Sequence, residues 1–145
     1  MIVDVHSPEL LDSKEFYEMF NGRVSIIDHH RKSVDFFNNA VVFHHNSSAS
    51  SASEMLTELL PYMSNSPIIG APEADALLAG IMLDTKNFVL KTGVRTFEAA
   101  AYLRRLGADT VESRKLFSNS MESYQKKTRL VSSAEVYRRC AVVIN

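Results

Sequence analysis

Cysteine and tryptophan are scarce in this chain: it has one cysteine, Cys140, and no tryptophan. An internal disulfide is therefore excluded, and the absence of a Cys-x-x-Cys pair argues against thiolate zinc sites and dithiol redox centres. Charge of one sign is also lacking, since the formal net charge is −1 at pH 7. Without a basic surface field we expect no binding to duplex nucleic acid, although a few local cations can still hold a nucleotide.

Long apolar runs are missing as well. No segment approaches the length needed to cross a bilayer, and the N-terminus has no cationic stretch followed by a long apolar one. Neither a Gly-x-Gly-x-x-Gly loop nor a Walker lysine loop is present, so a dinucleotide cofactor and ATPase activity are not indicated. At 145 residues, with 46% hydrophobic and 23% charged residues, the chain fits one globular domain. We expect a cytoplasmic location and no membrane contact by this chain.

Short apolar segments alternate with helical patterns along the chain. Strands are predicted over residues 1–5, 23–28 and 40–44, because these are short continuous apolar runs. A last strand is predicted from Ala141. This order predicts an α/β fold with a three-layer, doubly wound, mostly parallel sheet. The predicted helices cover 13–20, the segment from the Ser51 capping box to about Tyr62, a segment opened by Pro72, one capped by Thr96, one capped by Asp109, and 120–139 as one long element.

Acidic and imidazole side chains stand at the ends of the first two predicted strands. The first is followed by Asp4-Val5-His6 and the second by Asp28-His29-His30-Arg31. Ligands gather outside the carboxyl ends of parallel strands, and neighbouring strands would bring these two tips together. Either aspartate alone is more simply explained as a loop cap, but two such tips in successive strands favour a site.

A third carboxylate, Asp84, is expected to join them. It lies three residues after Ile81 on the helix opened by Pro72, so helical geometry places it on the buried face, unless a loop at the helix end turns it to solvent. Asp4, one histidine and Asp84 form a mixed oxygen and nitrogen set that suits Mn²⁺ better than zinc. Bridging carboxylates would allow two such ions about 3.5–4 Å apart that activate water against a phosphoryl group. His30 would then contact the phosphate or protonate the leaving oxygen.

Weaker candidates are two arginines and a serine. Arg31 and Arg95 are suited to holding phosphate oxygens, although solvated arginines are common. Ser51 lies at a predicted helix N-terminus, where anions bind readily, yet capping alone explains it. The pair at 44–45 lacks a carboxylate partner, and we do not count these histidines as ligands.

The ordered set of motifs resembles the DHH phosphoesterase superfamily. It consists of Asp4, the tetrapeptide 28–31 and the stretch 80–85, with further support from 48–55 and 85–100. Over nearly its whole length the chain resembles the catalytic part of the membrane-anchored cyclic-di-AMP phosphodiesterases of Gram-positive bacteria. The resemblance implies a Rossmann-like DHH domain that hydrolyses cyclic-di-AMP to linear di-adenylate with two Mn²⁺ ions. It also implies a parent protein anchored to the cell membrane, with this domain on the cytoplasmic side.

Residue roles follow from the same resemblance. The resemblance implies a catalytic role for His30, which would face the substrate, and for Asp28, the structural acid that would support it. The implied metal ligands are Asp4, His29 and Asp84, and the implied phosphate or nucleotide contacts are Arg31, Ser51 and Arg95.

The superfamily's first motif, His-x-x-x-Asp-x-Asp on an earlier strand, is absent, and so is its glycine-rich substrate-binding domain. We therefore expect a truncated piece, with a partial DHH domain over 1–118. A linker helix and the first strand of the next domain are expected over 119–145. Turnover by such a piece is expected to be very low, and its open sheet edge makes a homodimer one assembly to consider. The alternatives are an oligoribonuclease, exonuclease or pyrophosphatase of the same superfamily, and a non-catalytic α/β regulatory domain.

Overall fold

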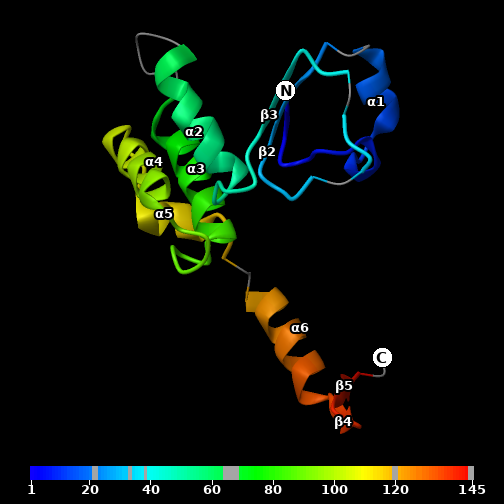
Figure 1. Cartoon of the computed structure of the whole chain (residues 1–145). Coiled ribbons are helices and arrows are strands. Elements are labelled where there is room, and N and C mark those ends of the chain that lie inside the picture. The colour runs from blue at the N-terminus through cyan, green and yellow to red at the C-terminus, as the bar shows by residue number, and fades with distance from the viewer. Residues whose placement is uncertain (21–22, 33, 38, 64–68, 119–120, 144–145) are drawn as a thin grey trace.

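The computed structural model describes residues 1–20, 23–32, 34–37, 39–63, 69–118 and 121–143. Its N-terminal part is a parallel sheet in the order β1-β2-β3 (Figure 1). The three strands predicted for this part are confirmed, as is their parallel arrangement, and they are β1 (Ile2–Val3), β2 (Ser25–Asp28) and β3 (Val42–His45).

The described residues also form a series of helices, most of them close to the predicted segments. A 3₁₀ turn, η1, precedes the first α-helix. In chain order they are η1 (Pro8–Leu10), α1 (Lys14–Met19), α2 (Ala52–Met63), α3 (Ala71–Asp84), α4 (Val94–Arg105), α5 (Thr110–Lys115) and α6 (Met121–Ser132).

Both faces of the central strand β2 are covered. Successive side chains of a strand point to opposite faces of the sheet, so Ile26 and Ile27 enter different cores. Ile26 packs with Phe37 and, on the side of α1, with Tyr17, whereas Ile27 packs with Met55 of α2. Strand β2 therefore has the two-sided burial of a strand in a three-layer α/β unit, and the predicted fold class is confirmed.

Helices α2 to α5 form a cluster beside the sheet (Figure 1). Its core contains Leu78 and Ile81 of α3 together with Leu103 of α4, all at most 1% exposed. Pro72 lies in the first turn of α3, as predicted. Asp109 caps α5, since its Oδ1 accepts the N–H of Val111 at 2.7 Å. Packing within this cluster fixes the C-terminal end of α3, where Asp84 lies.

The predicted Thr96 cap is wrong by three residues. Helix α4 begins at Val94, and Gly93 is its N-cap. Thr96 instead lies in the first turn, where its Oγ1 accepts the Gly93 N–H at 3.1 Å. A hydroxyl in the first turn can satisfy a free N–H group as a cap residue does, which is why the sequence pattern alone misplaced the helix start.

The long helix predicted over 120–139 is also wrong. Helix α6 ends at Ser132 and is followed by an antiparallel hairpin of β4 (Glu135–Tyr137) and β5 (Cys140–Val142). Between the strands, Arg138 and Arg139 have φ values of 46° and 69°, as a two-residue hairpin turn requires. Ser120, the predicted start of that helix, lies outside the described residues.

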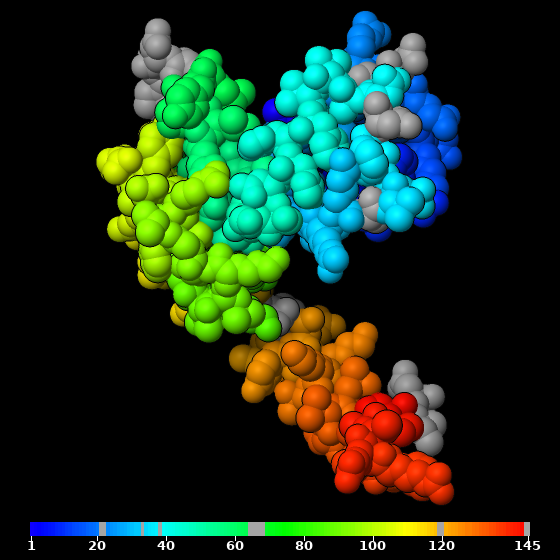
Figure 2. All heavy atoms as spheres, viewed as in Figure 1, coloured from blue at the N-terminus to red at the C-terminus, as the bar shows by residue number. Residues whose placement is uncertain are grey.

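Helix α6 and the hairpin extend away from the rest of the molecule (Figure 2). Helix α6 buries none of its described residues. None of the helices in the described part of the chain has both the length and the apolar character needed to cross a bilayer.

Candidate functional site

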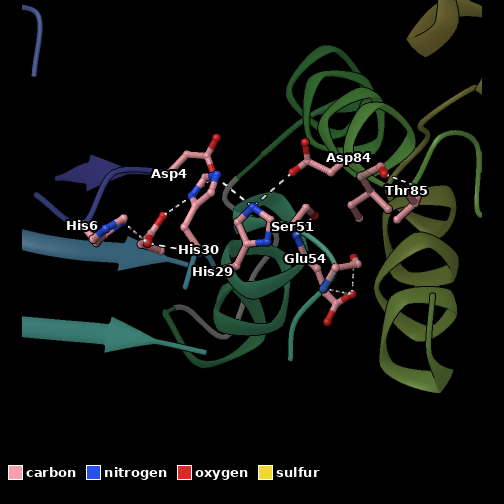
Figure 3. Close-up of polar contacts among 11 residues, drawn as sticks. Asp4, His6, His29, His30, Ser51, Glu54, Asp84 and Thr85 are labelled. Atoms are coloured by element: carbon pink, nitrogen blue, oxygen red, sulfur yellow. Dashed lines mark hydrogen bonds and ion pairs between the residues drawn. The ribbon is translucent and has the colours of Figure 1, made fainter. Parts of the chain in front are cut away.

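The ends of β1 and β2 bring the two predicted tips together. Val3 stands opposite Ile27 in the parallel register, and the N–H of Asp4 donates to the carbonyl of Ile27 at 2.9 Å. Asp4 has a φ of 66°, a left-handed conformation that is uncommon outside glycine. The chain therefore turns sharply at the strand end, and the Asp4 carboxylate lies beside the histidines that follow β2 (Figure 3).

Two carboxylates from different elements lie near the His29 ring. Its Nε2 lies 3.3 Å from Oδ1 of Asp4 and 3.5 Å from Oδ2 of Asp84. Figure 3 draws His29 between these two aspartates. The imidazole side chain is 8% exposed, whereas Asp4 and Asp84 reach solvent. Its other ring nitrogen, Nδ1, is buried without a hydrogen-bond partner among the described residues. Two carboxylates and one ring nitrogen therefore lie close together beyond the C-terminal ends of β1 and β2.

Asp84 is placed there by the end of α3. Thr85, the next residue, is fully buried, and its Oγ1 donates to the carbonyl of Ile81 at 2.6 Å and accepts the N–H of Phe88 at 2.9 Å. The expectation that Asp84 lies on the buried helix face is wrong, because its side chain is 34% exposed. The helix ends at this residue, so Thr85 takes the interior position and Asp84 faces His29.

Gly80 sets the separation of α2 and α3. A Cβ atom on this residue would lie 2.2 Å from Oγ of Ser53 and 3.0 Å from its Cβ. Only glycine permits this approach, and it brings the C-terminal turn of α3 toward the strand ends. The glycine thereby contributes to the position of Asp84.

Asp28 lies behind the cluster and is fully buried. Its Oδ1 is 2.8 Å from Nδ1 of His30, and its Oδ2 accepts the backbone N–H of the same residue at 3.2 Å. Oδ2 also lies 3.1 Å from Nδ1 of His6, which is 7% exposed. The sequence pattern assigns no role to His6, although its place two residues after Asp4 on the same strand end is a usable signal.

The electrostatics of the cluster are those of an excess of carboxylate. Burial raises the pKa of Asp84, with a smaller contribution from the charge of Asp4, and the nearby His29 opposes the rise. The pKa of His30 is raised chiefly by its hydrogen bond to Asp28, against the opposing effect of burial. The His30 shift reflects the nearby negative charge, which a bound cation would compensate, whereas the Asp84 shift comes mainly from burial.

Two groups of side chains in the described part of the chain are close enough to hold a metal ion. One is Asp4, His29 and His30, and the other is His6, Asp28 and His30, with ligand atoms in each group within 4.8 Å of one another. Asp28 has both oxygens committed to imidazole or backbone groups. In the first group, Nδ1 of His30 is also held by Asp28, so Asp4 and His29, together with Asp84 beside His29, are the better candidate metal ligands.

The three predicted substrate contacts lie apart from this cluster or on its rim. Arg31 is exposed and makes no hydrogen bond or ion pair with any residue that the structure describes. Ser51 is buried and caps α2, since its Oγ accepts the Glu54 N–H at 3.0 Å. Arg95 forms a two-bond ion pair with Glu58. The cluster thus unites five of the eight predicted residues.

Arg95 belongs to a different feature of the surface. Together with His44, Glu58 and Tyr102 it lines a groove of about 460 Å³ that includes none of the metal-site candidates. Glu58 accepts from Nε and Nη2 of Arg95 and raises the pKa of the arginine, so a phosphate contact by Arg95 would use Nη1 or would displace Glu58.

Comparison with known proteins shows that the chain is similar to several proteins along nearly its whole length. It is 42% identical over 137 residues to the cyclic-di-AMP phosphodiesterase PdeA of Listeria monocytogenes. It is 41% identical over 138 residues to the cyclic-di-AMP phosphodiesterase GdpP of Bacillus subtilis. These matches cover 94% and 95% of this chain but only 21% of each relative. The chain therefore spans about a fifth of the length of these curated relatives.

A solved structure shares the fold. The exopolyphosphatase-related protein from Bacteroides fragilis superimposes with a TM-score of 0.76 over 94% of this chain and 40% of that protein, at 21% sequence identity. At that identity the likeness concerns the fold alone. The family description "DHH family, N-terminal domain" matches residues 1–81, which include both strand-end tips. The chain belongs to the DHH family.

Proposed function

We propose that this chain forms part of a Mn²⁺-dependent phosphodiesterase that hydrolyses cyclic-di-AMP to linear di-adenylate. The observation that carries the proposal is the convergence of Asp4 and Asp84 on Nε2 of His29. The names of PdeA and GdpP, which share about two fifths of this sequence, support the choice of substrate.

The donor set fits a manganese ion. Two carboxylates and an imidazole nitrogen are hard to intermediate ligands, whereas a zinc site of this size more often contains thiolates or further histidines. Asp4, His29 and Asp84 would hold the metal. A divalent ion there supplies Lewis acidity toward the phosphoryl group and makes water a better nucleophile.

The side chains around this site have separable roles. His30 is held at Nδ1 by Asp28, which leaves Nε2 on the opposite edge of a half-exposed ring to face the substrate. In this position Nε2 exchanges a proton or hydrogen bond with a phosphate or leaving oxygen. Arg31, exposed and without an ion-pair partner among the described residues, contributes positive charge for a phosphate.

The proposal covers the longer protein as well. Residues 1–118 would form part of a DHH domain, and 119–145 would lead to a substrate-binding domain, in a parent held at the membrane. The cluster offers few ligands for a second ion, so we expect very low turnover from these 145 residues alone.

A chimaera tests the function directly. The matching 137-residue segment of Listeria PdeA is replaced by this chain, and hydrolysis of cyclic-di-AMP, linear di-adenylate and pyrophosphate is measured with Mn²⁺. We expect cyclic-di-AMP to be the preferred substrate. In the same chimaera, Asp84→Asn should reduce the rate by more than about 100-fold, because losing a metal ligand should cost more than the loss of a ligand's outer partner, which costs about 10–100-fold.

Other outcomes favour the alternatives. If the chimaera preferred linear di-adenylate or pyrophosphate, the proposed substrate would be wrong, but the proposed metal site would not be contradicted. A folded chimaera that turns over none of the three compounds would contradict the enzyme proposal and favour a regulatory domain.

A further inference from the structure

Asp28 stands between two imidazole rings that come from different strand ends. Its Oδ2 lies 3.1 Å from Nδ1 of His6, and its Oδ1 lies 2.8 Å from Nδ1 of His30. The carboxylate is fully buried, and His6 is 7% exposed. The two rings have their centroids 6.2 Å apart. A single carboxylate thus connects the loop after β1 with the histidine that faces the site.

A buried carboxylate costs free energy unless donors compensate it. The backbone N–H and ring of His30 supply two such donors, and both come from one strand end. His6 supplies a contact from a second element. Its own backbone is fixed, because its carbonyl accepts the Phe37 N–H at 3.1 Å and η1 begins two residues later at Pro8. The contact with His6 therefore fixes the plane of the Asp28 carboxylate.

The position of the ring proton of His30 follows from the fact that the Asp28 carboxylate is a hydrogen-bond acceptor. An ionised carboxylate only accepts hydrogen bonds, so the His30 ring, whose Nδ1 is hydrogen-bonded to Oδ1 of Asp28 at 2.8 Å, carries its proton on Nδ1. The hydrogen bond at one ring nitrogen determines which tautomer a neutral histidine adopts. The Nδ1–H tautomer of His30 leaves a lone pair on Nε2, the ring nitrogen that Asp28 does not hold.

We propose that His6 is a positioning residue that, through Asp28, holds His30 in the Nδ1–H tautomer with Nε2 directed toward the substrate. The tautomer part stands on the geometry of His6, Asp28 and His30. The use of Nε2 in hydrolysis rests on the proposed function.

The chain offers a matched pair of variants for the test. In His6→Asn the side-chain amide nitrogen occupies the place of Nδ1 and can still donate to Asp28. In His6→Gln the amide nitrogen lies where Nε2 was, so it misses that carboxylate. A merely structural role for His6 would make the two variants similar, whereas the positioning role separates them.

The measurement uses the metal-free 145-residue chain labelled with ¹⁵N. Ring nitrogen shifts are recorded from about two pH units above the ordinary histidine pKa of about 6.5 upward, until they no longer change with pH, because the pKa of His30 is raised and its ring becomes neutral later. We expect the Nδ1–H tautomer for His30 both in the wild type and in His6→Asn. In His6→Gln we expect His30 to populate both tautomers. Backbone amide spectra of β2 and β3 show whether each variant is folded.

Two results would overturn the proposal. One is an Nε2–H tautomer of His30 in the wild-type chain, a readout that requires no variant. The other is an unchanged Nδ1–H tautomer of His30 in folded His6→Gln.

The PdeA chimaera then separates this proposal from the proposed function. We expect His6→Gln to lower kcat about tenfold with little change in KM, in the range for losing an outer partner of a site residue, and His6→Asn to retain most of kcat. A chimaera without activity toward cyclic-di-AMP would remove the proposed function and leave the tautomer result intact. Equal activity of the two variants alongside the expected tautomers would show that the positioning of His30 does not serve the reaction.

Discussion

His29, just after β2, and Asp84, the last residue of α3, lie with Nε2 and Oδ2 3.5 Å apart. Asp4 approaches the same nitrogen from the end of β1. Three elements that are distant in sequence therefore meet at one imidazole. Two carboxylates this close repel each other in the absence of a cation, and this repulsion gives the site a measurable signature.

Asp84→Asn should change stability in opposite directions with and without metal. Because burial raises the pKa of Asp84, its ionised form costs stability near neutral pH, and the amide removes that cost. We expect the metal-free variant to melt at the same temperature as the wild type or higher. With Mn²⁺ present, the wild type should gain stability by binding and the variant should gain much less. Thermal unfolding with and without Mn²⁺ checks this, and an equal gain in both proteins would contradict it.

Gly80→Ala should destabilise the chain by about 1–3 kcal/mol, the usual cost of overpacking. The added Cβ would lie 2.2 Å from the hydroxyl of Ser53, so either this hydroxyl must rotate away or α2 and α3 must move apart. Ser53→Ala removes that hydroxyl and should recover part of the loss in the double variant. Urea unfolding of the four proteins in this double-mutant cycle provides the coupling. Additive effects would show that the two side-chain positions do not meet.

Ser51→Ala tests whether this residue is a helix cap. Its hydroxyl accepts the Glu54 N–H at the start of α2, and we expect the variant to lose about 1 kcal/mol of stability. Ser51→Asp preserves a capping oxygen and should retain most of the stability. Chemical unfolding of both variants makes the comparison. If the alanine variant kept full stability but the PdeA chimaera carrying it lost substrate affinity, Ser51 would be a substrate contact instead.

Asp109 should make the stability of α5 depend on acid pH. Hydrogen bonds from the backbone N–H groups of Val111 and Glu112 lower its pKa below the ordinary value of about 3.9. A lowered folded pKa means stability that is complete above the ordinary value and is lost as the pH falls through the folded one. Asp109→Asn retains a capping oxygen without this titration. The difference in unfolding free energy between the two proteins should therefore shrink on acidification, and a constant difference would contradict the assignment.

Local patterns predicted the sheet well. Short apolar runs located β1, β2 and β3, and the alternation of Ile26 and Ile27 is the reason that both faces of β2 are buried. Tertiary geometry was harder to predict. The exposure of Asp84 depends on where α3 ends, which is decided by the buried hydroxyl of Thr85. The end of α6 depends on a hairpin whose turn requires positive φ at Arg138 and Arg139. Arginine rarely adopts positive φ, so the sequence did not indicate a turn there.

The site shows the same division. The order of the motifs predicted the cluster of Asp4, Asp28, His29, His30 and Asp84. Pairing between distant side chains was not visible in the sequence. The bond of Arg95 to Glu58 and the approach of His6 to Asp28 both join separate elements, so only the folded chain reveals them.

The most direct test of the account is a Mn²⁺ titration of the ¹⁵N-labelled 145-residue chain and its Asp84→Asn variant, followed by paramagnetic broadening. The account predicts that ring signals of His29 and His30 broaden first in the wild type. In the variant, at least about tenfold more Mn²⁺ should be required, equivalent to about 1.4 kcal/mol of binding free energy. Broadening that begins at exposed acidic residues elsewhere, or that is the same in both proteins, would contradict a metal site formed by Asp4, His29 and Asp84.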